Sequence, residues 1–295
     1  MSPNTDSTVT LRDGHRLAYT EWGTPDGQPV VYFNGTPGTR VWCPDEAATV
    51  GAEVRLIIPD RPGVGASEPV PFTLADVPRM AADLADALDI SRFAVIGVSA
   101  GGSCAAACAA LIPSRLTGVA IANSSLAKWN WEARPEVVAA WPEGDRAEFE
   151  LVHRDRSAGV RLATANLAAY ASELAERPEA LHDDLAQAEG DRWFFDDPGR
   201  VAVFDAYIRD TFSQGVDAAV WEFIRVYFPW GFRLTDISIP VRIWHGGQDP
   251  WVRQEDIDYL VGAIPGASLV VWEDSGHLGF VKHWGEILGA LTGGA

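Results

Sequence analysis

Basic side chains, lysine above all, are scarce in this chain of 295 residues. The 23 Lys and Arg face 41 Asp and Glu, so the formal net charge is −18 at pH 7. Nucleic acids and anionic membranes are bound through compensating Lys and Arg, and the deficit therefore argues against both as partners. The three cysteines, Cys43, Cys104 and Cys108, are odd in number. We interpret them as small core residues rather than as a disulfide framework.

Signals for export and membrane insertion are missing as well. The N-terminus, residues 1–7, has no positive start followed by an apolar stretch, so no secretory signal is indicated and a cytoplasmic location is expected. The long apolar run from Phe93 to Ile112 contains three glycines and two serines. These residues indicate a turn between a buried strand and a helix rather than a membrane span.

Common metal and cofactor motifs are also absent. The sequence has no P-loop, no H-E-x-x-H and no paired cysteines that would suit zinc. The stretch Gly63-Val-Gly65 begins like a dinucleotide fingerprint, but Glu68 stands where the third glycine should be. We therefore predict a protein that needs neither a metal nor a cofactor.

The order of patterns along the chain predicts an α/β fold. Strand-like runs alternate with helical patterns such as Leu74 to Leu88 and Glu255 to Ala263, as a mostly parallel sheet requires. An N-terminal hairpin precedes them. We predict a mostly parallel eight-stranded sheet flanked by helices, with strands at Thr8, Arg16, Val30, Glu53, Phe93, Leu116, Val241 and Ser268.

One interval breaks this alternation. From Leu126 to Asp236 strand signals are lacking, and helical periods run from Leu162 to Leu174 and from Val216 to Tyr227. We predict that residues 126–236 form an inserted helical cap (lid), and that residues 1–125 and 237–295 form the core.

The pentapeptide Gly97-Val-Ser-Ala-Gly101 lies between a β-branched run and an Ala-rich helical run. This context favours a nucleophile elbow, a sharp strand-to-helix turn that exposes Ser99 at the edge of the sheet. Glycines two residues on either side would keep Cβ atoms out of the crowded corner. An ordinary turn between a strand and a helix is the alternative reading of the same pattern.

Two further residues complete a candidate triad with Ser99. Asp249 follows the strand that begins at Val241, and His277 follows the next strand, so both would reach the same edge of the sheet. A serine hydroxyl needs a base, and the base needs an anion that fixes its tautomer; His277 and Asp249 suit these roles. Asp274 is a weaker candidate for the acid, because its position only three residues before His277 favours a role in shaping the loop.

Acyl chemistry also needs donors for the oxyanion of the transition state. The glycine-containing loop Asn34-Gly-Thr-Pro-Gly38 follows the strand at Val30. We predict that the backbone N–H groups of Thr36 and Ala100 form the oxyanion hole, the second of them at a helix N-terminus. A plain surface turn is the alternative for this loop.

With these motifs, the chain resembles the α/β-hydrolase fold superfamily, in the branch with a helical cap. The resemblance covers nearly the whole chain and also includes Asp60-Arg-Pro-Gly-Val-Gly-Ala-Ser67, His245-Gly-Gly-Gln-Asp249 and Ser275-Gly-His277. It implies a Ser-His-Asp hydrolase, most readily a carboxylesterase. Family members usually have His-Gly at Asn34-Gly35, so the side chain beside the oxyanion loop differs here.

The predicted cap is rich in aromatic residues, most of which we expect to pack it onto the core. The remainder would line an apolar pocket above the nucleophile, and our candidates are Trp129, Trp131, Trp221, Tyr227 and Trp230. We predict hydrolysis of a carboxylic ester or related acyl bond of an apolar or aromatic small molecule. A proline-iminopeptidase-like amidase, a C–C hydrolase or a cofactor-free lyase would share these motifs. A non-hydrolytic binding protein on the same fold is the alternative from another class.

Overall fold

The computed structural model describes residues 3–124, 138–139, 141 and 143–293. Within them, eight strands form one sheet in the order β1-β2-β4-β3-β5-β6-β7-β8. The strands are β1 Thr5–Thr10, β2 Arg16–Gly23, β3 Gln28–Phe33, β4 Val54–Pro59, β5 Phe93–Val98, β6 Leu116–Ala122, β7 Val241–Gly246 and β8 Ser268–Trp272. Strand β2 is antiparallel to β1 and β4, and the other pairs are parallel. The predicted mostly parallel eight-stranded sheet is confirmed.

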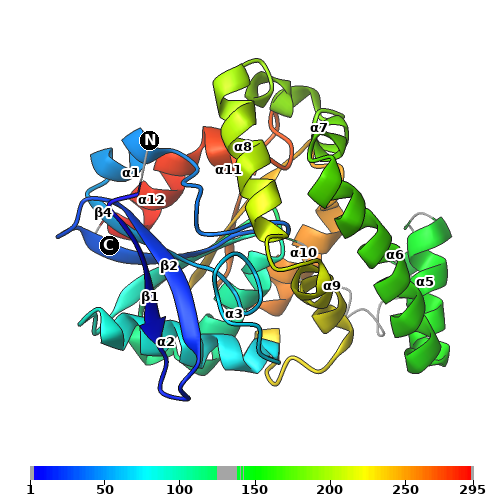
Figure 1. The fold of residues 1–295 in the computed structure, drawn as a ribbon, viewed down its shortest axis with the longest axis horizontal. Helices are drawn as coiled ribbons and strands as arrows, with labels where there is room; N and C mark the ends of the chain where they lie inside the picture. Colours follow the sequence, from blue (N-terminus) through cyan, green and yellow to red (C-terminus); the bar gives the residue numbers. More distant parts are fainter. Residues whose placement is uncertain (1–2, 125–137, 140, 142, 294–295) are drawn as a thin grey trace.

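Helices cover both faces of the sheet (Figure 1). Because side chains alternate along a strand, Tyr32 packs on one face and its neighbours Val31 and Phe33 on the other. The first face carries α1 (Glu46–Gly51), α11 (Gly279–Lys282) and α12 (Trp284–Thr292), and the second carries α2 (Val77–Ala87), α3 (Gly101–Leu111) and α10 (Gln254–Ala263). Strand β5 is buried at all six positions, which explains why it reads as a continuous apolar run.

The strand order creates a crevice at the carboxyl ends of the central strands. Strand β3 lies between β4 and β5, so the chain leaves β3 in one direction and crosses back over it to reach β5. The loops after β3 and β5 therefore diverge. In open α/β sheets, ligands bind at such a switch point.

Between β6 and β7 the described chain is helical and lies along one side of the sheet (Figure 1). Up to residue 227 its elements are α5 (Glu143–Arg154), α6 (Arg156–Glu176), α7 (Glu179–Leu185), η4 (Glu189–Phe194), α8 (Pro198–Thr211), α9 (Asp217–Ile224) and η5 (Arg225–Tyr227), and η6 (Leu234–Asp236) follows before β7. We call residues 143–227 the helical segment. Its buried side chains, among them Leu174 and Phe204, join the apolar cluster of the first face. The division into a core and a cap at residues 126 and 236 stays a prediction.

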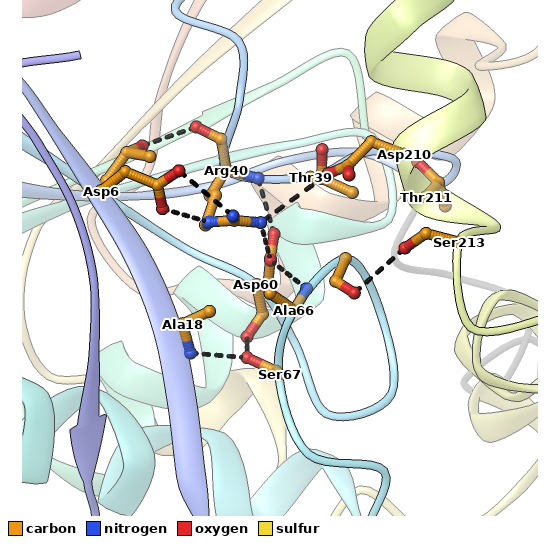
Figure 2. A network of polar contacts seen from close by, with 12 residues as sticks. Asp6, Ala18, Thr39, Arg40, Asp60, Ala66, Ser67, Asp210, Thr211 and Ser213 are labelled. Carbon is orange, nitrogen blue, oxygen red and sulfur yellow. Dashed lines mark hydrogen bonds and ion pairs between the residues drawn. The ribbon is translucent and has the colours of Figure 1, made fainter.

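A polar network ties the helical segment to the loops after β3 and β4 (Figure 2). Arg40 pairs with Asp6 of β1 and with Asp60, each at 2.8 Å, and lies 3.7 Å from Asp210 of α8. The carboxylate of Asp60 also accepts the backbone N–H of Ala66 at 2.9 Å. Burial is the largest influence on Asp60 and raises its pKa, although these bonds oppose it. The network holds the loop after β3 at a set distance from α8.

Candidate active site

Ser99 stands in the tight turn between β5 and α3. Its φ is 53°, in the left-handed region that residues other than glycine rarely adopt. A Cβ at Gly97 would lie 2.3 Å from the carbonyl oxygen of Gly101, and a Cβ at Gly101 would lie 2.1 Å from that of Phe33. Only glycine fits at these two positions, for the reason that the sequence pattern suggested. The strand, the sharp turn and the helix surround Ser99 as an elbow requires.

His277 and Asp249 are brought together from the ends of β8 and β7. His277 Nδ1 lies 2.7 Å from Asp249 Oδ2. The other carboxylate oxygen accepts the backbone N–H groups of Trp251 and Val252 at 2.9 and 3.0 Å. Burial, the largest influence, raises the pKa of Asp249, but His277 and the hydrogen bonds together lower it below its usual value. An ionised Asp249 fixes the imidazole through Nδ1 and leaves Nε2 available for proton transfer.

Asn123 is a further partner of Asp249 to which the sequence pattern assigned no role. It follows β6, is completely buried, and donates from Nδ2 to Asp249 Oδ2 at 2.9 Å and to the carbonyl of Gly276 at 3.1 Å. One amide thus joins the acid to the residue that precedes His277. A carboxylate at this position would repel Asp249, whereas the amide donates to it.

The loop after β3 runs beside Ser99. A Cβ placed on Gly35 would lie 3.0 Å from Cβ of Ser99 and 3.6 Å from its Oγ. Asn34 stands where the family that the chain resembles usually has histidine. It donates to the carbonyl of Thr39 at 2.7 Å and accepts from the Tyr207 hydroxyl at 3.4 Å. The asparagine therefore closes the loop on itself and connects it to α8.

Both peptides predicted to supply oxyanion donors have their carbonyls held by side chains. The N–H of Thr36 shares its peptide with the carbonyl of Gly35, which accepts from Arg61 Nη2 at 2.8 Å. The N–H of Ala100 shares its peptide with the carbonyl of Ser99, which accepts from Ser124 Oγ at 2.5 Å. In a trans peptide the N–H points away from the C=O, so these bonds direct both N–H groups away from Arg61 and Ser124. Hydrogen bonding to a carbonyl also polarises the N–H of the same peptide.

A buried ion cluster connects the helical segment to the Gly35–Thr36 peptide and to the next peptide after the Ala100 N–H, between Ala100 and Gly101. Glu222 of α9 pairs with Arg61, lies 3.8 Å from Arg225, and accepts the Thr36 hydroxyl at 2.8 Å. Arg225 donates to the carbonyl of Ala100 at 3.3 Å. Burial is the largest influence on Glu222 and raises its pKa, but the two guanidinium charges outweigh it, so the pKa falls below its ordinary value.

Ser99, Thr36 and His277 line one cavity of about 500 Å³, a volume typical of small-molecule sites. The rest of the lining is largely apolar and comes from the core as well as from the helical segment. It includes Trp42, Leu167, Leu185, Phe204, Phe223 and Phe280. The sequence-predicted nucleophile, base and oxyanion loop therefore face a common space.

Three of the predicted pocket aromatics, Trp221, Tyr227 and Trp230, are not among the residues that line this cavity. Trp129 and Trp131 lie outside the described residues. The Tyr227 hydroxyl donates to a glutamate of α5, and Trp230 packs in the apolar cluster on the opposite face, with α2 and α3. Trp221 also faces elsewhere, so the prediction is wrong for these three residues.

The helical twist explains the error at Trp221. Phe223 of the same helix lines the cavity. Residues two positions apart in an α-helix point in directions that differ by about 200° around the axis. Trp221 therefore points away and donates from Nε1 to the carbonyl of Phe72 at 2.9 Å. Trp42 and Phe280 come from outside the predicted cap, where no signal marked them as pocket residues.

Across residues 3–124, 138–139, 141 and 143–293, no three or more His, Cys, Asp or Glu side chains gather in a way that could hold a metal ion. In the same part of the chain, no helix combines the length and apolar character needed to cross a bilayer.

Comparisons with known proteins agree with the observed fold. The model of the alpha/beta hydrolase fold family matches residues 28–283. A non-heme chloroperoxidase from Streptomyces lividans is 38% identical over 99 residues, but this match spans only 32% of the chain and 36% of that protein. A proline iminopeptidase from Xylella fastidiosa is 26% identical over 314 positions, which cover 95% of the chain and 93% of the relative.

Solved structures share the whole architecture. A thermophilic esterase from Thermogutta terrifontis superposes with a TM-score of 0.65 at 22% identity, covering 97% of this chain and 96% of the esterase. At this level of identity the likeness shows the fold alone.

Proposed function

The chain belongs to the alpha/beta hydrolase fold family, and from that premise we propose that it is a serine hydrolase of carboxylic esters or related acyl bonds. The observation that carries the proposal is that Ser99 and His277 line one cavity while Asp249 binds the other side of the imidazole. A serine hydroxyl becomes a useful nucleophile only with such a base in reach. The largely apolar lining favours an apolar or aromatic small molecule.

In the proposed mechanism, Ser99 Oγ attacks the carbonyl carbon while its proton passes to His277 Nε2. The imidazolium is stabilised by Asp249, and the oxyanion is bound by the N–H groups of Thr36 and Ala100. His277 then gives the proton to the departing alcohol, which leaves an acyl-enzyme. A water molecule, deprotonated by His277, attacks the acyl carbon. The bond between this carbon and Ser99 Oγ then breaks, His277 returns the proton to Oγ, and the acid leaves.

Labelling and turnover together test this proposal. We expect a fluorophosphonate probe to modify the wild-type protein at Ser99 and to leave S99A unmodified, and we expect aryl esters to be hydrolysed only by the wild type. Failure of both readouts in folded protein would refute the proposal. Tight ligand binding without labelling would favour the binding-protein alternative, and turnover of C–C substrates without ester hydrolysis would favour the C–C hydrolase.

A second candidate, an amidase acting on amine-bearing substrates, is favoured by one side chain. Asp184 of α7 is the only acidic residue in the described cavity lining, which contains no Lys or Arg. Its carboxylate accepts the Tyr170 hydroxyl at 3.3 Å. An ammonium group would pair with this carboxylate in surroundings of low polarity. The similarity to a proline iminopeptidase agrees with such a substrate.

Paired substrates separate the two candidates. Aminoacyl anilides and aryl esters with a terminal ammonium group would be compared with neutral esters of equal length. If an amine is recognised, D184N should lose the preference for the ammonium substrate, whereas D183N, which alters the exposed neighbouring carboxylate, should keep it. Equal rates for charged and neutral substrates in the wild type would exclude the amine-binding role.

A further inference from the structure

A carboxylate of the helical segment binds the loop that carries His277. Asp191 of η4 accepts the backbone N–H of Gly276 at 2.9 Å through Oδ1 and the backbone N–H of Leu278 at 2.8 Å through Oδ2. These two groups belong to the residues on either side of His277. One buried side chain thus holds the backbone both before and after the imidazole.

The two backbones are in direct contact at this point. A Cβ on Gly276 would lie 2.4 Å from Cβ of Ala188 and 2.5 Å from Asp191 Oδ2, and a Cβ on Gly190 would lie 2.1 Å from the carbonyl oxygen of Asp274. The N–H of Gly190 also donates to Gln248 Oε1 at 2.9 Å. The contact between η4 and the His277 loop therefore leaves no room for side chains at either glycine.

The groups that oppose the burial of Asp191 belong to the loop that carries His277. Burial of a carboxylate is unfavourable unless charges and hydrogen bonds compensate for it. Burial is the largest influence on Asp191 and raises its pKa, and the charge on Asp249 adds to the rise. The bonds from Leu278 and Gly276 and the charge on His277 act in the opposite direction, but the pKa stays above its usual value.

We propose that Asp191 is a positioning residue for His277. Asp249 fixes the rotation of the ring through Nδ1, whereas Asp191 fixes the backbone from which the ring extends, so the two carboxylates restrain different degrees of freedom. The same bond couples the helical segment, which lines the cavity, to the loop of the base. This inference rests on the proposed function, because Asp191 acts only through His277.

The substitution D191N tests the role with little change in size. The amide oxygen can still accept one backbone N–H, but the amide nitrogen would face the other donor. Since a misplacement of about 1 Å can cost about a hundredfold in rate, we expect kcat for an aryl ester to fall about tenfold to a hundredfold, with KM within about twofold. The downfield proton resonance of the His277–Asp249 bond should shift or broaden.

Glu189→Gln is the matched control, because it removes an exposed carboxylate from the same η4 turn and should leave kcat unchanged. The variant G276A tests the contact from the other side, since its Cβ would collide with Asp191 Oδ2 and with Cβ of Ala188, which precedes η4. It should lower kcat in the same way. The double variant should lose less than the product of the two single losses, because both substitutions break one contact.

The outcomes separate this inference from the proposed function. Wild-type kcat in folded D191N or folded G276A, or a change in KM alone, would overturn the positioning role and leave the hydrolase proposal standing. Ester hydrolysis that persists in S99A would overturn the hydrolase proposal instead. If D191N does not fold, G276A and the proton resonance of His277 decide the matter.

Discussion

Replacing Asp249 by asparagine probes the proposed triad most directly. The carboxylate accepts four hydrogen bonds, from the backbone N–H groups of Trp251 and Val252 at one oxygen and from His277 and Asn123 at the other. In D249N the amide oxygen would keep the two backbone donors. The amide nitrogen would then face His277 Nδ1, which would have to become the acceptor.

This exchange reverses the tautomer of the base. His277 would carry its proton on Nε2 and could not take one from Ser99. The equivalent substitution in a serine protease lowers kcat about 10⁴-fold, and at 1.36 kcal/mol for each factor of ten this equals about 5 kcal/mol of lost transition-state stabilisation. The fold should survive, because Asn123 Oδ1 is buried without a partner and could accept from the new amide after a flip of its side chain.

The assay is kcat for an aryl ester together with the rate of fluorophosphonate labelling at Ser99. Asp274→Asn provides the control, since Asp274 is an exposed carboxylate of the loop that carries His277 and pairs with Lys282. D274N should retain wild-type rates. A loss of less than about tenfold in folded D249N, or an equal loss in D274N, would refute the assignment of Asp249 as the acid.

Three further predictions concern the buried supports of the site. E222Q should destabilise the protein by about 3 to 5 kcal/mol in urea unfolding, because it leaves the charges of Arg61 and Arg225 buried without their carboxylate. The pKa of Glu222 is lower in the folded than in the unfolded protein, so the ionised carboxylate stabilises the fold above the unfolded pKa of about 4, and this effect is lost as the pH falls through the folded pKa. The difference in unfolding free energy between wild type and E222Q should therefore narrow on acidification. A difference that stays constant with pH would contradict this prediction. G101A should abolish soluble expression or activity, because its Cβ would lie 2.1 Å from the carbonyl oxygen of Phe33 in β3; soluble G101A with wild-type kcat would show that the turn has more room than the structure gives it.

Much of the fold and the candidate reacting groups could be predicted because their signals are local. Alternation between strand and helix patterns places the carboxyl ends of parallel strands at one edge of a sheet. Ser99, Asp249 and His277 each lie in the connection that follows such a strand, so their order along the chain was enough to propose that they meet. The glycines around Ser99 carry an equally local signal, because the crowding at Gly97 and Gly101 arises within the turn and from β3 beside it.

The side chains that support and surround these groups depended on tertiary structure. The choice between Trp221 and Phe223 rests on the rotation of α9 about its axis, which packing against the core decides. Asp191 binds Gly276 and Leu278, which lie 85 and 87 positions further along the chain. A contact between residues so far apart leaves no short sequence motif that would predict it. The sequence alone was enough to propose which groups could react and at which edge of the sheet they lie. Packing of the helical segment decided which side chains hold those groups and which line the cavity. Such contacts join segments that are distant in the sequence, so they depend on how the packed faces of the helices and the sheet fit together.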